Sequence, residues 1–343
     1  MALSFIKNEI VPRVFAMAPF ASLQKLTGVI PLIPYYHGVS DDHVPHVKHL
    51  YQFKNVQQFT KDLNTFLRLY KPIDLRDFVN SLNKHVQLPN NSLLLTFDDG
   101  FREQHDVVAP LLWEKGVPAT FFLIAGCLDN MDMPYDNKVS LLIEHLIRIG
   151  TNNHRKRLLQ ILADCGLRQT NLRTALLSLN YAKKYVLDEI ASVLHFDFTE
   201  YLVKSRPYLT SDQVRKLISM GFTIGAHSMD HPKYSLISLP EQLYQTRTSI
   251  RSIRERFSLD YGAFAFPNGD DNMSHQFFKQ IFADGNIDAS FGNLALLTRA
   301  HPRDFPRLPM ENTCASAERI IGRYYAHALY HRILGHHSII YHP

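Results

Sequence analysis

Two adjacent carboxylates, Asp98 and Asp99, stand at the end of an apolar, strand-like run and directly before Gly100. Within a strand, neighbouring side chains point to opposite faces, but at a strand end the backbone can turn and aim both carboxylates at one site. One of them can then bind a metal ion while the other stays free as a base. Paired carboxylates at the C-terminal end of a buried strand are typical of α/β enzyme active sites. An Asp-rich surface turn is the alternative interpretation of this segment alone.

Two histidines, His227 and His231, follow a second short apolar run at residues 222–226. Imidazole is the commonest protein ligand of metal ions. Two histidines and one carboxylate form the facial arrangement of non-haem iron enzymes and of many hydrolytic zinc sites. Pro232 follows His231, and a residue before proline avoids the α region, so the pair belongs to a loop after a strand, as the two carboxylates do. The alternative is a solvated loop or a helix face without a metal ion.

Three segments resemble, in the same order, the motifs of the polysaccharide deacetylases, which are carbohydrate esterase family 4 and chitooligosaccharide-deacetylase-like. They are residues 96–100 (Thr-Phe-Asp-Asp-Gly), 227–231 (His-Ser-Met-Asp-His) and 264–269 (Phe-Ala-Phe-Pro-Asn-Gly). The resemblance covers roughly residues 30–125 and 206–310. It implies an α/β fold, a distorted (β/α)7 barrel, and a hydrolase that removes acetyl groups.

The resemblance also implies roles for individual residues. Asp99, His227 and His231 would hold a divalent metal ion, with zinc as the default and iron, nickel or cobalt as alternatives. Such an ion activates water and polarises the acetyl oxygen. Asp98 would be the general base, and the backbone N–H of Asn268 would stabilise the oxyanion. An ordinary loop is the alternative for the Pro-Asn-Gly turn that carries Asn268.

The chain departs from the common family pattern in the residue that would protonate the leaving group. Position 265 is Ala, so the arginine that usually orients the base is missing there. In the biofilm poly-N-acetylglucosamine deacetylases the motif order is permuted, and residues 29–39 resemble the N-terminal strand that carries their acid. His37 is therefore the predicted acid, with a buried core histidine as the alternative. His342, at the end of another short apolar run, is a rival acid. Arg307 resembles a late arginine of that subgroup and could orient Asp98 or form a structural ion pair.

The pattern along the chain predicts the elements that position these residues. Near-continuous apolar runs at residues 32–36, 93–97 and 119–124 are typical of buried parallel strands. After residue 210 a Thr210/Gln213 capping box, the helix-stopping Gly221 and a helix opened by Pro240 continue the alternation of helices and strands. Alternating elements of this kind indicate a parallel, barrel-like sheet, here over residues 29–128 and 206–314.

Residues 129–205 lack strand-like alternation and show several helical stripes. We interpret them as a helical insertion that forms either a lid over the substrate or a stabilising bundle. Residues 1–28 are expected to form an N-terminal helical segment that packs on the domain or touches a membrane surface. Residues 315–343 are expected to form a C-terminal helix and tail.

Composition sets further limits. The 343 residues are 45% hydrophobic and 20% charged, as in ordinary globular proteins, and the net charge is +5. No Lys/Arg run with interleaved aromatic residues indicates nucleic-acid binding. Three widely spaced cysteines argue against a disulfide framework, and the N-terminus is a poor secretory signal. We therefore expect a cytoplasmic protein, peripheral to the membrane if the N-terminal segment binds it. The oligomeric state stays open.

The leading hypothesis is thus a metal-dependent hydrolase that removes acetyl groups from N- or O-acetylated sugars of a glycan, glycolipid or sugar precursor. Two alternatives remain open. One is a deformylase or amidase that acts on a non-carbohydrate amide. The other is a catalytically silent glycan-binding or scaffold protein on the same fold.

Overall fold

A computed structural model describes residues 20–150, 154–293 and 301–333 of the chain. Its strands are β1 (Pro34–Tyr36), β2 (Lys71–Pro72), β3 (Ser92–Leu93), β4 (Thr96–Phe97), β5 (Thr120–Leu123), β6 (Thr223–Ala226), β7 (Ala263–Ala265), β8 (Ala289–Gly292), β9 (Asp304–Pro306) and β10 (Leu308–Pro309). Its α-helices are α3 (Phe20–Thr27), α4 (Val56–Leu69), α5 (Leu75–Lys84), α6 (Ala109–Glu114), α7 (Tyr135–Ile149), α8 (Arg155–Asp164), α9 (Leu172–Leu177), α10 (Val186–Val193), α11 (Phe198–Ser205), α12 (Ser211–Ser219), α13 (Leu239–Phe257), α14 (His275–Ala283) and α15 (Ala317–Ile333).

The main sheet is a parallel barrel with seven strand positions. Its strand order is β10-β1-β4-β5-β6-β7-β8-β9, and every pairing is parallel. Only Arg307 separates β9 from β10. This one segment pairs with β8 through its first half and with β1 through its second half, and it therefore closes the ring. The predicted (β/α)7 barrel is confirmed.

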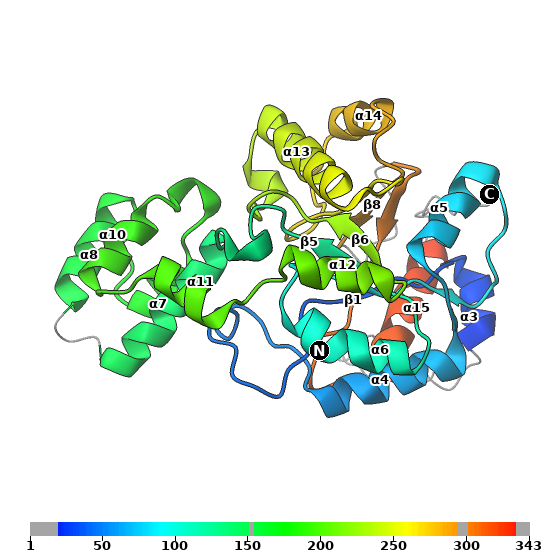
Figure 1. The fold of residues 1–343 in the computed structure, drawn as a ribbon, viewed down its shortest axis with the longest axis horizontal. Coiled ribbons are helices and arrows are strands. Elements are labelled where there is room, and N and C mark those ends of the chain that lie inside the picture. Colours follow the sequence, from blue (N-terminus) through cyan, green and yellow to red (C-terminus); the bar gives the residue numbers. More distant parts are fainter. Residues whose placement is uncertain (1–19, 151–153, 294–300, 334–343) are drawn as a thin grey trace.

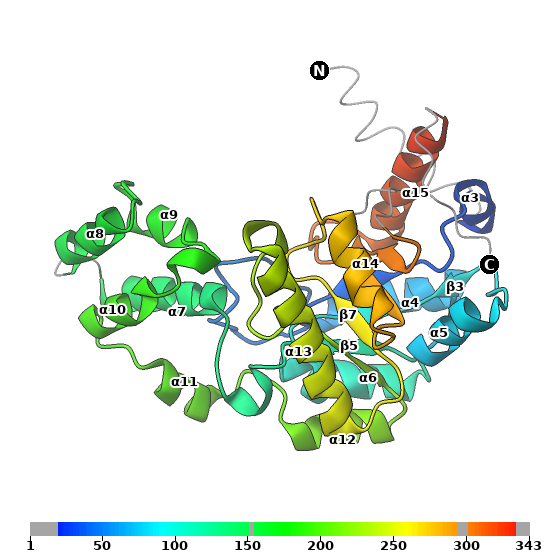
Figure 2. The same ribbon diagram turned by 90° about the horizontal axis from the view of Figure 1, so that it is seen from above.

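Local sequence signals explain where the helices begin and end. Both α4 and α12 start with a capping box, the latter from Thr210 and Gln213 as predicted. Pro240 occupies the first turn of α13, where its missing N–H costs nothing. Gly221 follows the end of α12 with a φ of +92°, a left-handed conformation that ends a helix before β6. In Figures 1 and 2 the helices surround the barrel strands.

The apolar run at residues 93–97 is split between two sheets. Leu93 in β3 pairs with Pro72 of β2 and bridges to Leu32, whereas Thr96 and Phe97 form β4 inside the barrel. The sequence predicts one strand here because the run is near-continuously apolar. The structure divides it because the first half finds its partner outside the barrel.

The segment between β5 and β6 folds as a helical unit beside the barrel, as Figure 1 shows on its left side. Helices α7 to α11 enclose their own apolar core, separate from the barrel core. Val44, Val47 and Phe101 from loops after barrel strands join that second core. Within the predicted insertion, residues 129–205, the described residues contain helices and no strand, while the domain boundaries stay predictions.

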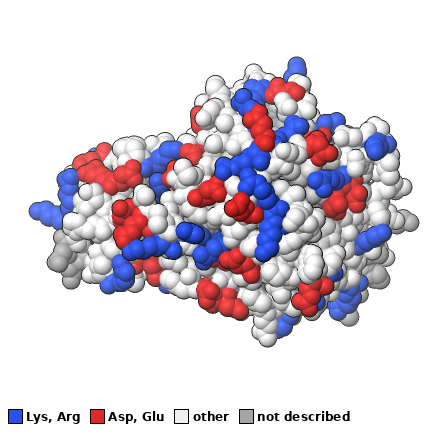
Figure 3. All heavy atoms as spheres, viewed as in Figure 1, with Lys and Arg blue, Asp and Glu red and all other residues white. Residues whose placement is uncertain are grey.

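The chain ends lie partly outside the described residues. Of the predicted N-terminal segment only α3 and the residues after it are described, and α15 packs against α3 and α4. Among the described residues, no helix has both the length and the apolar character needed to cross a bilayer. Figure 3 shows Lys and Arg side chains interspersed with Asp and Glu on one face of the molecule.

Candidate active site

The candidate site lies at the C-terminal ends of the barrel strands. His37 follows β1, Asp98 and Asp99 follow β4, and His227 follows β6. Asn268 comes three residues after β7. Because all strands are parallel, their C-terminal ends meet at one mouth of the barrel, which is where barrel enzymes carry their reactive groups. The topology thus gathers residues that are up to about 230 positions apart in the sequence.

The end of β4 sends its two carboxylates to different partners. The Asp98 N–H still donates to the carbonyl of Tyr36 at 2.9 Å, so Asp98 continues the sheet. Asp99 then turns into the left-handed region with a φ of +73°, and Gly100 follows at +70°. Such conformations are costly for a residue other than glycine and cluster at functional sites. The turn is what lets neighbouring side chains serve one site.

Asp98 is held by a fully buried arginine. Arg307 donates two parallel hydrogen bonds to the carboxylate, each 2.7 Å long, and its Nε–H donates to the Gly292 carbonyl at 3.2 Å. Burial alone would raise the pKa of Asp98, but Arg307 outweighs it and lowers the pKa below its usual range. Asp98 is therefore an anion of fixed orientation. Arg307 therefore pairs with Asp98, and its role in catalysis as an orienting residue stays a prediction.

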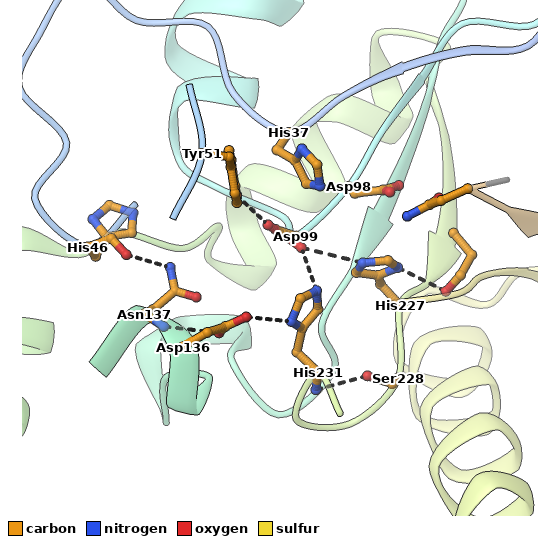
Figure 4. Close-up of polar contacts among 12 residues, drawn as sticks. His37, His46, Tyr51, Asp98, Asp99, Asp136, Asn137, His227, Ser228 and His231 are labelled. Carbon is orange, nitrogen blue, oxygen red and sulfur yellow. Dashed lines mark hydrogen bonds and ion pairs between the residues drawn. The ribbon is translucent and has the colours of Figure 1, made fainter. Parts of the chain in front are cut away.

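Asp99, His227 and His231 form a buried cluster of metal-ligating atoms. Their ligand atoms all lie within 4.8 Å of one another. Oδ1 of Asp99 lies 3.4 Å from Nε2 of each histidine (Figure 4). This oxygen is buried and accepts no hydrogen bond within the described part of the chain. Three potential ligands therefore face a common centre.

The outer contacts of the two histidines decide which nitrogen faces that centre. Nδ1 of His227 lies 2.8 Å from the carbonyl of Ala265, and Nδ1 of His231 lies 3.2 Å from a carboxylate oxygen of Asp136. Both partners accept a hydrogen bond, so each Nδ1 carries a proton and Nε2 is the ring nitrogen that faces the common centre. Two imidazole nitrogens and an unpartnered carboxylate oxygen therefore face one place, which is the donor set that a divalent cation requires.

The charge distribution also favours a cation there. Burial lowers the pKa of His231, but the carboxylates of Asp136 and Asp99 raise it to about 9 overall. The surroundings therefore stabilise positive charge at this ring, which a proton or a metal ion can supply.

The second oxygen of Asp99 accepts a hydrogen bond from the Tyr51 hydroxyl at 2.9 Å, which fixes the direction of the free oxygen.

The loop that carries the two histidines is built on unusual backbone angles. Ser228 and His231 have φ values of +66° and +62°, and the Ser228 hydroxyl accepts from the His231 N–H at 3.0 Å. The Gly126 N–H donates to the Met229 carbonyl at 2.9 Å. A Cβ at Gly126 would lie only 2.5 Å from that carbonyl oxygen, so only glycine allows this approach. The tight loop brings both rings to one side.

His37 is paired with Glu311. Its Nδ1 lies 2.7 Å from one carboxylate oxygen, and its backbone N–H donates to the other at 2.8 Å. Burial lowers the pKa of His37, but Glu311 and Asp99 raise it to about 10. The ring of His37 is thus in its positively charged, doubly protonated form at neutral pH. The rival acid, His342, lies outside the described residues.

Asn268 lies in the left-handed region with a φ of +57°, followed by Gly269 at +104°. It lines a cavity of about 620 Å³ together with His37 and His231. The predicted Pro-Asn-Gly turn is therefore present beside the other site residues. Its role in binding an oxyanion stays a prediction.

Sequence reasoning missed three residues of this site, Asp136, Glu311 and Tyr51. Glu311 comes four residues after Arg307, at the end of the same barrel segment, so its place could have been deduced once the last strand was identified. Asp136 and Tyr51 come from α7 and from the loop after β1. No motif marks these two residues, because the path of the loop after β1 and the packing of α7 against the barrel bring them to the site only in the folded structure.

Comparisons with known proteins identify the family. A family model for polysaccharide deacetylases matches residues 85–281. The fold resembles the Streptococcus pyogenes deacetylase PplD in complex with acetate, with a TM-score of 0.55, 15% identity, and coverage of 85% of this chain and 97% of that chain. It also resembles IcaB from Ammonifex degensii, with a TM-score of 0.51, 13% identity, and coverage of 86% and 96%. No curated protein sequence matches the chain significantly.

The closed parallel barrel, with its buried carboxylates and histidines at the strand ends, defines an α/β-barrel hydrolase. The matched residues make up more than half of the 343-residue chain. The chain therefore belongs to the polysaccharide deacetylase family, carbohydrate esterase family 4, whose members hydrolyse amide bonds other than peptide bonds.

Proposed function

We propose that this protein is a metal-dependent deacetylase that removes acetyl groups from N- or O-acetylated sugars of a glycan, glycolipid or sugar precursor. One observation carries the proposal. Three groups meet at the C-terminal ends of the strands: the candidate metal centre, the oriented carboxylate of Asp98 and the protonated ring of His37. His231 of the metal centre and His37 line the same cavity. These are the groups that hydrolysis of an amide requires.

The metal would be held by Asp99, His227 and His231. Two imidazole nitrogens and one carboxylate oxygen suit zinc, and they also suit iron, nickel or cobalt. When bound there, the ion would supply a Lewis acid that polarises the acetyl carbonyl and increases the acidity of water. Asp136 and the carbonyl of Ala265 hold the two rings, and Tyr51 holds the carboxylate.

The proton transfers would be divided between two residues on different strands. Asp98, kept anionic and oriented by Arg307, accepts a proton from the attacking water. His37, kept protonated by Glu311, donates a proton to the leaving nitrogen or oxygen. The backbone N–H of Asn268 stabilises the developing oxyanion. Water adds to the acetyl carbon, the bond to the sugar nitrogen or oxygen breaks, and acetate and a free amine or hydroxyl are the products.

The test is acetate release by the zinc-loaded protein from tri-N-acetylchitotriose, from O-acetylated sugars and from a panel of non-carbohydrate amides and formamides. We expect acetate from at least one acetylated sugar and loss of that activity in Asp98→Asn. Preferential turnover of a formamide or a non-carbohydrate amide would instead support the deformylase or amidase alternative. A protein that binds glycans, holds no stoichiometric metal and turns over nothing would support the silent alternative.

Two parts of the prediction extend beyond the chemistry. We propose that the helical unit acts as a wall or lid over the substrate, because α7 supplies Asp136 and lines the cavity. The cytoplasmic location and the contact of the N-terminal segment with a membrane surface stay predictions from the sequence.

A further inference from the structure

The cavity beside the catalytic residues is lined by two kinds of side chain. Polar and aromatic groups, among them His37, His231, Asn268 and three tyrosines, form one part of the lining. Five aliphatic residues also line the cavity, and we call them the aliphatic wall: Leu50, Val139, Leu176, Leu177 and Leu179. Leu50 belongs to the loop after β1 and Val139 to α7. Leu176 and Leu177 end α9, and Leu179 follows that helix two residues later.

The aliphatic wall is a fixed part of the structure. Leu176 and Leu179 are almost completely buried in the core of the helical unit, while Leu177 is 38% exposed. That unit is tied to the site loops from two directions. The Asn137 side chain donates to the carbonyl of His46 at 3.0 Å, and Lys184 contacts Asp230 at 2.6 Å. The wall is therefore held next to the catalytic groups.

Aliphatic side chains set a condition on what they can bind. They neither donate nor accept hydrogen bonds, so a sugar hydroxyl pressed against them loses its water partners without replacement. Sugars bound along a polymer chain would place hydroxyl groups at this wall. A hydrocarbon group placed there would instead gain from leaving water. Because the cavity is about 620 Å³, it has room for more than the acetylated end of a substrate.

We infer that the substrate is an acetylated sugar that carries a hydrocarbon group, as a glycolipid or a lipid-linked sugar does. This inference rests on the proposed function, because the acetyl group occupies the metal end of the cavity. We place the hydrocarbon group on the sugar side of the scissile bond. It lies against the aliphatic wall, while the polar groups that line the same cavity bind the sugar ring.

The test compares methyl and octyl glycosides of N-acetylglucosamine, below the micellar concentration of the latter, with tri-N-acetylchitotriose. We measure kcat/KM by acetate release and, independently, the affinity of each glycoside by titration calorimetry with the zinc-loaded protein. Seven extra methylene groups that are only partly buried should improve kcat/KM and affinity at least about tenfold over the methyl glycoside. The calorimetry decides the inference even if no glycoside is hydrolysed, in which case the proposed function fails on its own.

Variants separate the wall from general apolar binding. Leu177→Gln should remove most of the advantage in kcat/KM and in affinity that the octyl glycoside has over the methyl glycoside. Its matched control is Ile147→Gln, because Ile147 is 63% exposed on α7 and does not line the cavity. Equal affinity for octyl and methyl glycosides would overturn the inference, and so would a preference for the chitotriose. Faster cleavage of an N-octanoyl than of an N-acetyl sugar would also overturn it, because the hydrocarbon would then lie on the acyl side.

Discussion

The contact between Asp136 and His231 gives the sharpest prediction about the metal centre. Asp136 lies in the first turn of α7, and its carboxylate oxygen is 3.2 Å from Nδ1 of His231. Carboxylates in this position orient a ligating imidazole and increase its basicity. Replacing Asp136 by Asn or Ala should therefore weaken zinc binding, although Asp136 is not itself one of the three ligands.

The magnitude follows from what each variant retains. Loss of such an outer contact typically costs 10- to 100-fold in metal affinity, which is about 1.4–2.7 kcal/mol. Asp136→Asn keeps an oxygen that can accept from Nδ1 but loses the charge, so we expect about a tenfold loss. Asp136→Ala loses both, so we expect about a hundredfold loss.

The assay is competition for zinc between the metal-free protein and a chromophoric chelator of known affinity. Asp132→Asn is the matched control, because it removes the same charge from the same segment at a side chain that is 59% exposed and pairs with Lys138. Its zinc affinity should equal that of the unmodified protein. If both Asp136 variants bind zinc as tightly as the control, Asp136 does not orient the ligand and the reasoning is refuted.

Three further predictions concern the proton transfers. Asp98→Asn should lower kcat by about 100- to 10,000-fold while the protein still binds zinc; substantial retained activity would contradict its role as the base. Glu311→Gln should lower the pKa of His37 from about 10, because the anion that favours the protonated ring is gone. The alkaline limb of the pH–rate profile should therefore move to lower pH, and an unchanged limb would show that His37 is not the acid. Arg307→Met should raise the pKa of Asp98, because burial then acts without the opposing cation, and should move the acidic limb to higher pH. At neutral pH Arg307→Met should also lower the free energy of unfolding by about 3–5 kcal/mol, and Arg307→Lys should restore part of that free energy. If Arg307→Met were as stable as the unmodified protein and its acidic limb did not move, the pairing of Arg307 with Asp98 would be refuted.

The stabilising contribution of the Asp98–Arg307 pair depends on pH in a defined direction. The pKa of Asp98 is lower in the folded protein than in the unfolded chain. The contribution is therefore fully present above the unfolded pKa and is lost as the pH falls through the folded pKa. Acid should destabilise the unmodified protein more than Arg307→Met, because the variant has already lost this contribution.

The sequence by itself determined the strand ends that carry the chemistry. Runs of buried apolar residues before Asp98 and before His227 predict strands, and parallel strands must bring their C-terminal ends to one mouth of the barrel. The identity of the paired residues, two carboxylates and two histidines, already indicates a metal site with a separate base. These inferences depend only on residue type, local order and the geometry of a parallel sheet.

Only the tertiary structure decided how each group is held. The bidentate contact of Arg307 with Asp98 spans 209 positions of the chain, and Glu311 meets His37 across 274. No local propensity encodes such contacts, because they arise only when the last barrel segment closes against β1. Asp136 and four of the five aliphatic wall residues come from the helical unit, which sequence reasoning could place only as an insertion. Whether an inserted unit faces the site or solvent depends on the packing of its core against the site loops, and a pattern of helical stripes contains no such information.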